Sequence, residues 1–154
     1  MKAIHWIIAV AAFVFAEPVQ AGVNDPEIII YRFPGVVDIG GGANTASATV
    51  FHCTNFSGVT ENIRLVTRGS DGVILSNVAN IIDHLNTKTF ATKFVASYFE
   101  ISLNTGAVVQ GTTAIAATSI NVICTAMSID AASFVPIGVA LRGIRFNPIP
   151  GSQE

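Results

Sequence analysis

The chain has 154 residues, of which 51% are hydrophobic and only 12% are charged, against about 25% charged residues in average globular chains. Its formal net charge is −2 at pH 7, and because nucleic-acid-binding proteins usually concentrate basic side chains in one stripe, we expect no nucleic-acid partner. The length suits one domain and is too short for two ordinary ones.

The first 21 residues have the pattern of a secretory signal peptide. Lys2 gives a positively charged start, residues 7–15 are an unbroken apolar run, and residues 19–21 place a small side chain at a cleavage point. The apolar run is much shorter than the roughly 20 residues that cross a bilayer. We therefore predict a signal peptide over 1–21, a mature domain over 22–154 that is exported to the periplasm or outside the cell, and no stable membrane insertion after cleavage.

Strands are predicted in the first half of the mature domain, where β-branched residues lie between turn residues. Residues 27–33 form the first strand, which we expect to end at Pro34-Gly35. Residues 45–55 carry apolar side chains on both faces, a pattern typical of a central strand. Residues 62–68 alternate, with apolar side chains on one inward face, and a tight hairpin is predicted at Gly69–Gly72.

The second half continues as short strands. Residues 73–75 should be the returning strand of the hairpin. Residues 78–85 fit both a strand and an amphipathic helix of one or two turns, and the strand is preferred because asparagines at 77, 80 and 86 are unfavourable in helix interiors. The remaining predicted strands are residues 87–92, 96–103, 111–118, 119–129 and 139–146.

Seven to nine short strands separated by turn residues, without βαβ alternation, are typical of an antiparallel sandwich. We predict an all-β fold, namely a single-domain antiparallel β-sandwich of Greek-key topology with one inter-strand disulfide. The disulfide joins Cys53 and Cys124, because export moves the chain to an oxidising compartment. The alternatives are two buried free thiols or a metal pair, and the metal pair is disfavoured because the sequence has no C-x-x-C spacing.

Residues 51–58 (FHCTNFSG) and residues 143–151 (GIRFNPIPG) are the two segments that resemble other proteins. They resemble segments of a group of small exported bacterial proteins of unknown function. The resemblance implies a β-sandwich in the bacterial envelope or secretome. It implies no functional residues that could be assigned here.

The histidines and serines form no recognisable catalytic motif. The sequence has no G-x-S-x-G, and the mature chain has only two histidines, His52 and His84. Asp83 precedes His84 directly, so on a strand the two side chains would point to opposite faces and could not form two members of a triad. His52 is expected to be a partly buried, hydrogen-bonded residue.

The carboxylates are candidates for metal ligands and for a glycosidase pair. Asp25, Glu27 and Asp38 could form a calcium site only if the fold brought them together. Glu61 and Glu100 are the only glutamates in the body of the domain, and nothing in the sequence places them side by side.

Three further segments have structural explanations. Gly40-Gly41-Gly42 lacks the lysine of a phosphate loop and is interpreted as a mobile connection. Asn55-Phe56-Ser57 is a glycosylation pattern that turn chemistry also explains. Arg142 and Arg145, with Phe146, are interpreted as solvated arginines at a sheet edge rather than as a rim for an anionic partner.

The sequence therefore predicts no catalytic, cofactor-binding or metal residues and no cofactor. The leading hypothesis is a non-enzymatic binding or structural module of the envelope or secretome, with an unknown protein or glycan partner or a homo-oligomeric state. The alternative is a small secreted hydrolase or metal-dependent enzyme. That alternative requires His52, His84 or the pair Glu61 and Glu100 to converge on a concave pocket.

Overall fold

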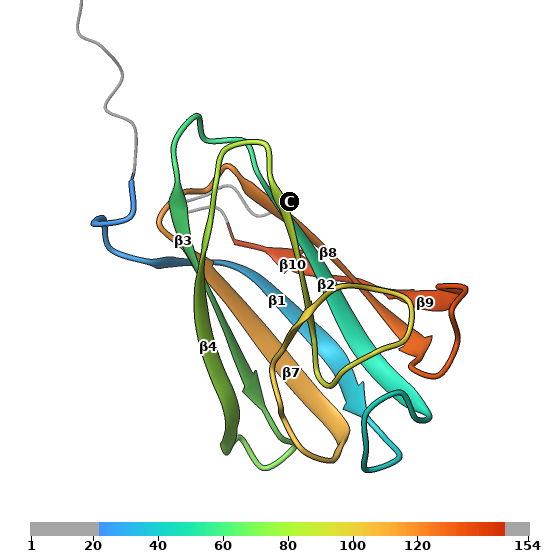
Figure 1. Cartoon of the computed structure of the whole chain (residues 1–154). Coiled ribbons are helices and arrows are strands. Elements are labelled where there is room, and N and C mark those ends of the chain that lie inside the picture. The colour runs from blue at the N-terminus through green and yellow to red at the C-terminus, as the bar shows by residue number, and fades with distance from the viewer. Residues whose placement is uncertain (1–21, 147–154) are drawn as a thin grey trace, which may run out of the picture.

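The computed structural model describes residues 22–146. The described residues form strands and turns with no helix among them, which confirms the all-β prediction (Figure 1). No helix in this part of the chain is long and apolar enough to cross a membrane. The predicted signal peptide over 1–21 and residues 147–154 lie outside the described residues.

The strands follow one another with short connections. In chain order they are β1 (Ile28–Asp38), β2 (Ser47–Asn55), β3 (Glu61–Arg68), β4 (Ile74–Ile82), β5 (Thr87–Ala91), β6 (Ile101–Ser102), β7 (Val108–Ala117), β8 (Val122–Asp130), β9 (Gly138–Leu141) and β10 (Ile144–Arg145).

Hydrogen bonds join these strands into one curled sheet (Figure 1). The order is β4-β3-β7-β1-β2-β5-β6, with β8 also beside β2, β9 beside β8, and β10 beside β1. β1 and β2 share the single pair Asp38 and Ala48, whereas β1 pairs along its length with β7, and β2 with β8. The sheet therefore bends at Asp38 and Ala48.

Side chains from both sides of this bend meet in one core. The phenyl rings of Phe33 on β1 and Phe51 on β2 lie edge to face with centroids 5.7 Å apart, and both residues are fully buried. The alternation in β3 places Ile63 and Leu65 in the same core, as predicted. Burial of these apolar side chains is the main source of stability in a domain of this size.

Three other predictions are confirmed. β2 has neighbours on both sides and is central in the sheet. β3 and β4 form the predicted hairpin, in which Gly72 has a φ of 82° that favours glycine. Residues 78–82 belong to β4, so the strand interpretation of this ambiguous segment is correct up to Ile82.

The predicted end of the first strand at Pro34-Gly35 is wrong, because β1 continues to Asp38. Its ladder with β7 has a register shift between Pro34 and Val36, and Gly35 has a φ of 79°. A bulge of this kind accommodates a proline that cannot donate and lets the pairing resume beyond it.

The strand predicted over 96–103 is also wrong, since only Ile101–Ser102 (β6) is extended. Before it, the backbone N–H of Val95 donates to Glu100 Oε1 over 2.9 Å, which closes residues 95–100 into a loop. Residues 92–100 bring the chain back to the level of Phe90, so that β6 runs in the same direction as β5 and pairs with it in parallel. The described sheet is therefore mixed. The predicted antiparallel arrangement is confirmed for every strand pair except β5 and β6.

The strand predicted over 139–146 is interrupted. β9 pairs with β8 and β10 pairs with β1, so residues 142–143 cross from one side of the bend to the other. Gly143 lies against the Phe33 ring, and a Cβ there would overlap the ring atoms. The chain can cross at this point only because residue 143 has no side chain.

Replacement of Gly143 by Ala should consequently destabilise the domain. Overpacking of a full core typically lowers the free energy of unfolding by about 1–3 kcal/mol. Urea unfolding of the Gly143→Ala variant measures this loss. Gly22→Ala is the control, because a Cβ at Gly22 meets nothing within 4 Å; equal stability of the two variants would contradict the steric explanation.

The disulfide joins Cys53 and Cys124, as predicted, and no described cysteine is free. The two residues are directly opposed on the neighbouring strands β2 and β8, with Cα atoms 4.1 Å apart. The bond therefore links adjacent strands of the sheet and does not cross the core.

Candidate functional site

Two adjoining hollows open beside the bend of the sheet, between the loop of residues 39–46 and the segment of residues 92–107. The first has a volume of about 480 Å³ and the second about 570 Å³. Ala43 and Phe94 line both hollows, so the two hollows adjoin at these residues. Volumes of this size are typical of small-molecule sites.

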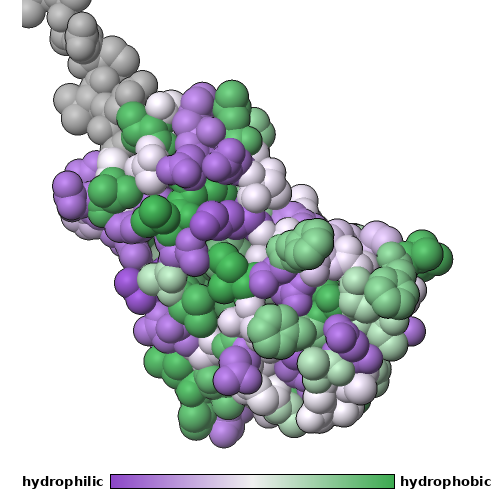
Figure 2. Space-filling model, in the orientation of Figure 1, coloured by the Kyte–Doolittle hydropathy of each residue, from purple (hydrophilic) through white to green (hydrophobic). Residues whose placement is uncertain are grey.

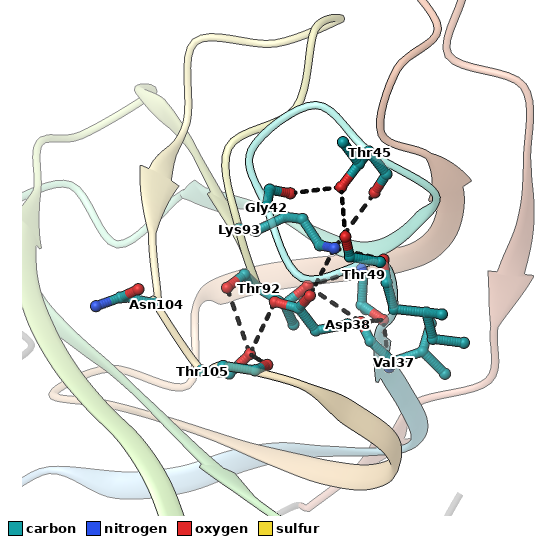
Figure 3. A network of polar contacts seen from close by, with 12 residues as sticks. Val37, Asp38, Gly42, Thr45, Thr49, Thr92, Lys93, Asn104 and Thr105 are labelled. Carbon is teal, nitrogen blue, oxygen red and sulfur yellow. Dashed lines mark hydrogen bonds and ion pairs between the residues drawn. The ribbon is translucent and has the colours of Figure 1, made fainter.

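A buried ion pair forms the floor of the first hollow (Figure 3). Lys93 Nζ lies 2.7 Å from Asp38 Oδ1, and both side chains are less than a tenth exposed. The same ammonium donates to the carbonyl oxygens of Ile39 over 2.5 Å and Thr45 over 3.3 Å. Its three donors are therefore all used.

Threonine hydroxyls complete this floor. Thr105 Oγ1 donates to Asp38 Oδ2 over 3.2 Å, so both carboxylate oxygens have partners. Thr92 Oγ1 donates to the Val37 carbonyl and accepts from the Thr49 backbone N–H, each over 3.1 Å. A buried charge pair is stable only when its remaining hydrogen-bonding capacity is met in this way.

The loop of residues 39–46, the glycine loop, forms one wall of the first hollow. It contains Gly40-Gly41-Gly42, which is interpreted from the sequence as a mobile connection. Thr45 Oγ1 contacts the carbonyl oxygens of Gly40 at 3.0 Å and Gly42 at 2.8 Å (Figure 3). Gly40 and Gly41 have φ values of 101° and 67°, which favour glycine. The loop is thus held by Thr45 from within and by Lys93 from below.

Aromatic rings border the second hollow. Phe94 is 57% exposed and Phe99 is 106% exposed, as exposed as a side chain can be. Tyr98 and Glu100 also line this hollow. Glu100 Oε1 accepts from Val95, while its Oε2 is buried and has no hydrogen-bond partner among the described residues.

His52 lies under the loop that carries these rings. Its Nδ1 is 3.0 Å from Thr89 Oγ1, and its ring meets the Tyr98 ring edge to face at 4.7 Å. Burial lowers the pKa of His52 below its ordinary value of 6.5, because the charged imidazolium loses hydration. The partly buried, hydrogen-bonded role expected from the sequence is thus what the structure describes.

This shift should make stability depend on pH. Because the pKa is lower in the folded state, the unfolded chain binds the proton more readily, so the free energy of unfolding falls as pH drops through 6.5 and levels off below the folded pKa. Urea unfolding measures the free energy of unfolding at pH 8 and at pH 5. Its decrease from pH 8 to pH 5 should be smaller for His52→Gln than for the wild type. An equal decrease in the two proteins would contradict this explanation.

The other proposed catalytic residues have separate partners. His84 Nδ1 accepts from the Gly58 N–H over 3.0 Å. Glu61 is fully buried. The Thr118 hydroxyl donates a hydrogen bond to Glu61 Oε2, and Glu61 Oε1 has no hydrogen-bond partner among the described residues. Of His52, His84, Glu61 and Glu100, only Glu100 lines one of the two hollows, so the convergence that the enzyme alternative requires is not seen there.

The three acids considered for calcium are also apart. Asp25 accepts from the Gly22 N–H over 2.7 Å, and Glu27 forms an ion pair with Arg64 at 2.6 Å. Asp38 belongs to the pair with Lys93. Among residues 22–146, no group of three or more His, Cys, Asp or Glu side chains could hold a metal ion.

The glycosylation pattern and the arginines have structural roles. Asn55 is fully buried, and its Nδ2 donates to the carbonyls of Val59 and Ile82, so a glycan could not be attached without unfolding this turn. The Arg145 guanidinium lies 5.5 Å from the centre of the Tyr31 ring and donates to the Ile120 carbonyl. Arg145 is exposed on β10, as expected for a solvated arginine at a sheet edge, and these two contacts also tie it to the rest of the fold.

Comparison of the chain with family models, with curated proteins and with solved structures gave no match.

The hollows could not be recognised in the sequence because they contain no motif. A signal was present in the lone Lys93, which stands within an otherwise uncharged stretch between two phenylalanines (FATKF). A lysine in such a position is either exposed or paired, and here it is paired with a residue far away in the chain.

Proposed function

We propose that the protein is an exported, non-enzymatic binding module of the bacterial envelope or secretome, and that it binds a protein or glycan in the two hollows. The observation that carries this proposal is the exposure of Phe94 and Phe99 beside a preformed concavity. Large exposed rings are unfavourable in water unless a partner covers them.

The rigidity of the floor supports the same function. Lys93 holds the glycine loop, Asp38 and the end of β5 in one fixed arrangement. A preformed site loses less conformational entropy on binding than a flexible one. The polar network is thus suited to hold the rings and the loop in place for a ligand.

Export is supported by the disulfide, since such bonds persist in oxidising compartments. A signal peptide over 1–21 and membership of the small exported bacterial proteins that residues 51–58 and 143–151 resemble are parts of the same proposal. We also propose that the two sides of the curled sheet form a β-sandwich of Greek-key topology. Its support is the single residue pair that joins β1 to β2, which leaves the two sides nearly separate.

Self-association is a second candidate, favoured by a different surface. The run from Phe134 to Val139 at β9 has no charged residue, and its exposed fractions are 84% at Phe134, 77% at Ile137 and 72% at Val139. Figure 2 shows hydrophobic side chains at the tip of the molecule that bears β9. An exposed uncharged edge of this kind favours pairing with a second copy. Light scattering of the mature chain measures its oligomeric state.

The binding proposal is tested by retention from envelope extract on immobilised, oxidised mature chain (22–154). We expect a component that is retained by the wild type and lost with Phe94→Ala or Phe99→Ala. Phe56→Ala is the matched control, because Phe56 is 51% exposed and follows the opposite end of β2. Retention that is absent, or equal in all variants, would contradict the proposal.

A further inference from the structure

The positive charge in the hollows is compensated within the protein. Lys93 uses its three donors on Asp38, Ile39 and Thr45, and Thr105 occupies the second oxygen of Asp38. No donor of this lysine is left for a phosphate or carboxylate. The site therefore offers no uncompensated positive charge to an anion.

The remaining acid in the lining does not provide a cation site either. Glu100 Oε1 accepts the Val95 N–H, and its Oε2 is shielded from solvent. A cationic ligand would need an exposed carboxylate oxygen. Electrostatic complementarity thus favours an uncharged ligand.

Free polar groups at the rim are amides. Asn104 lines the first hollow and Asn44 the second, and neither side chain makes a hydrogen bond to another described residue. Figure 3 shows the Asn104 side chain apart from the hydrogen-bonded network of Asp38 and Lys93. Both asparagines have a positive φ, 48° at Asn104 and 54° at Asn44, an uncommon conformation for a side-chain-bearing residue.

Each hollow thus combines an exposed ring with an unpaired amide. Phe94 separates the hollows and contributes to both, and Phe99 borders the second. A phenyl face carries partial negative charge and attracts C–H groups, while an amide both donates to and accepts from hydroxyl groups. A sugar ring has C–H groups on one face and hydroxyl groups around its edge.

We propose that the two hollows bind successive sugar units of a neutral oligosaccharide, with Phe94 and Phe99 stacking on the rings and Asn104 and Asn44 bonding their hydroxyl groups. This inference rests on the proposed binding function and names the class of ligand. It is a non-covalent site, and it requires no metal and no bond cleavage.

Calorimetric titration of the oxidised mature chain tests it with four hexasaccharides. Three are neutral (maltohexaose, cellohexaose and the hexamer of N-acetylglucosamine), and one is anionic (hexagalacturonate). We expect at least one neutral sugar to bind and the anionic one not to bind. Phe94→Ala and Asn104→Ala should each weaken binding by about tenfold, as expected for loss of one aromatic or hydrogen-bonding contact, and Phe56→Ala should leave it unchanged.

The outcomes separate this inference from the proposed function. If only hexagalacturonate binds, or if no sugar binds while envelope extract yields a component whose retention needs Phe94, the neutral-glycan inference is overturned and the binding function stands. If neither sugar nor extract component binds, both fail. Binding of a neutral sugar that Phe94→Ala leaves intact would place it elsewhere and overturn the inference as well.

Discussion

Removal of the disulfide should lower the free energy of unfolding by about 4 kcal/mol. The bond joins residues 71 positions apart, and loop-entropy estimates for a closed loop of this length give a value of that size. Such a loss is a large part of the roughly 5–15 kcal/mol that is usual for small domains. Cys53 and Cys124 are both buried on neighbouring strands, so Cys53→Ala/Cys124→Ala can retain the ladder of β2 and β8.

Urea unfolding of the double variant measures the effect. Reduction of the wild type is the matched comparison, since it breaks the same bond without changing the sequence. Reductant should destabilise the wild type by a similar amount and leave the double variant unaffected. A loss below about 1 kcal/mol, or two reactive thiols in the unfolded, unreduced wild type, would show that this bond does not stabilise the domain as described.

Replacement of Lys93 by Met is expected to be equally damaging. Lys93→Met keeps an unbranched side chain of similar length but leaves the Asp38 carboxylate buried without its cation. Removing one partner of a buried pair typically lowers stability by about 3–5 kcal/mol. The carbonyls of Ile39 and Thr45 also lose their donor, so the glycine loop should loosen.

Addition of Asp38→Asn to Lys93→Met separates the charge effect from loss of packing. In Lys93→Met/Asp38→Asn no unpaired charge remains, and the amide oxygen that replaces the carboxylate can still accept from Thr105. We expect the double variant to be more stable than Lys93→Met in thermal and urea unfolding. If the two variants were equally stable, or if Lys93→Met matched the wild type, the pair would not be the structural floor that we describe.

The predictions that succeeded depend on local chemistry. The alternation of Ile63 and Leu65 defined β3, and the residues of the Gly69–Gly72 turn identified the hairpin, because side-chain period and positive φ are properties of neighbouring residues. The disulfide followed from the count of two cysteines and the expected compartment. These features require no knowledge of the tertiary fold.

The predictions that failed depend on residues distant in the chain. β6 is parallel to β5 because residues 92–100, with a loop closed by Val95 and Glu100, return the chain to the level of Phe90, and such a return leaves no hairpin turn signal between the strands. Likewise, the interruption at Gly143 is caused by Phe33, which lies on the first strand. Side-chain periodicity and turn residues are properties of neighbouring residues, so they contain no information on the pairing of β6 with β5 or on the contact of Gly143 with Phe33.

The candidate site escaped sequence-based prediction for a related reason. Histidines and paired acids are the usual signals of a site, whereas the hollows consist of backbone turns, phenyl rings and amides around one ion pair. Asp38 was considered as a calcium ligand, but its partner Lys93 is far from it in sequence. A lone lysine in an apolar segment is the kind of residue that should prompt a search for a distant acid.

Backbone amide NMR of the oxidised mature chain during titration with the neutral hexasaccharides tests the central claim most directly. We expect chemical-shift changes to be concentrated in residues 40–46 and 92–107, with little change at residues 134–141. Changes concentrated at residues 134–141, or no changes with any of the sugars or with a component retained from envelope extract, would contradict the assignment of these hollows as the binding site.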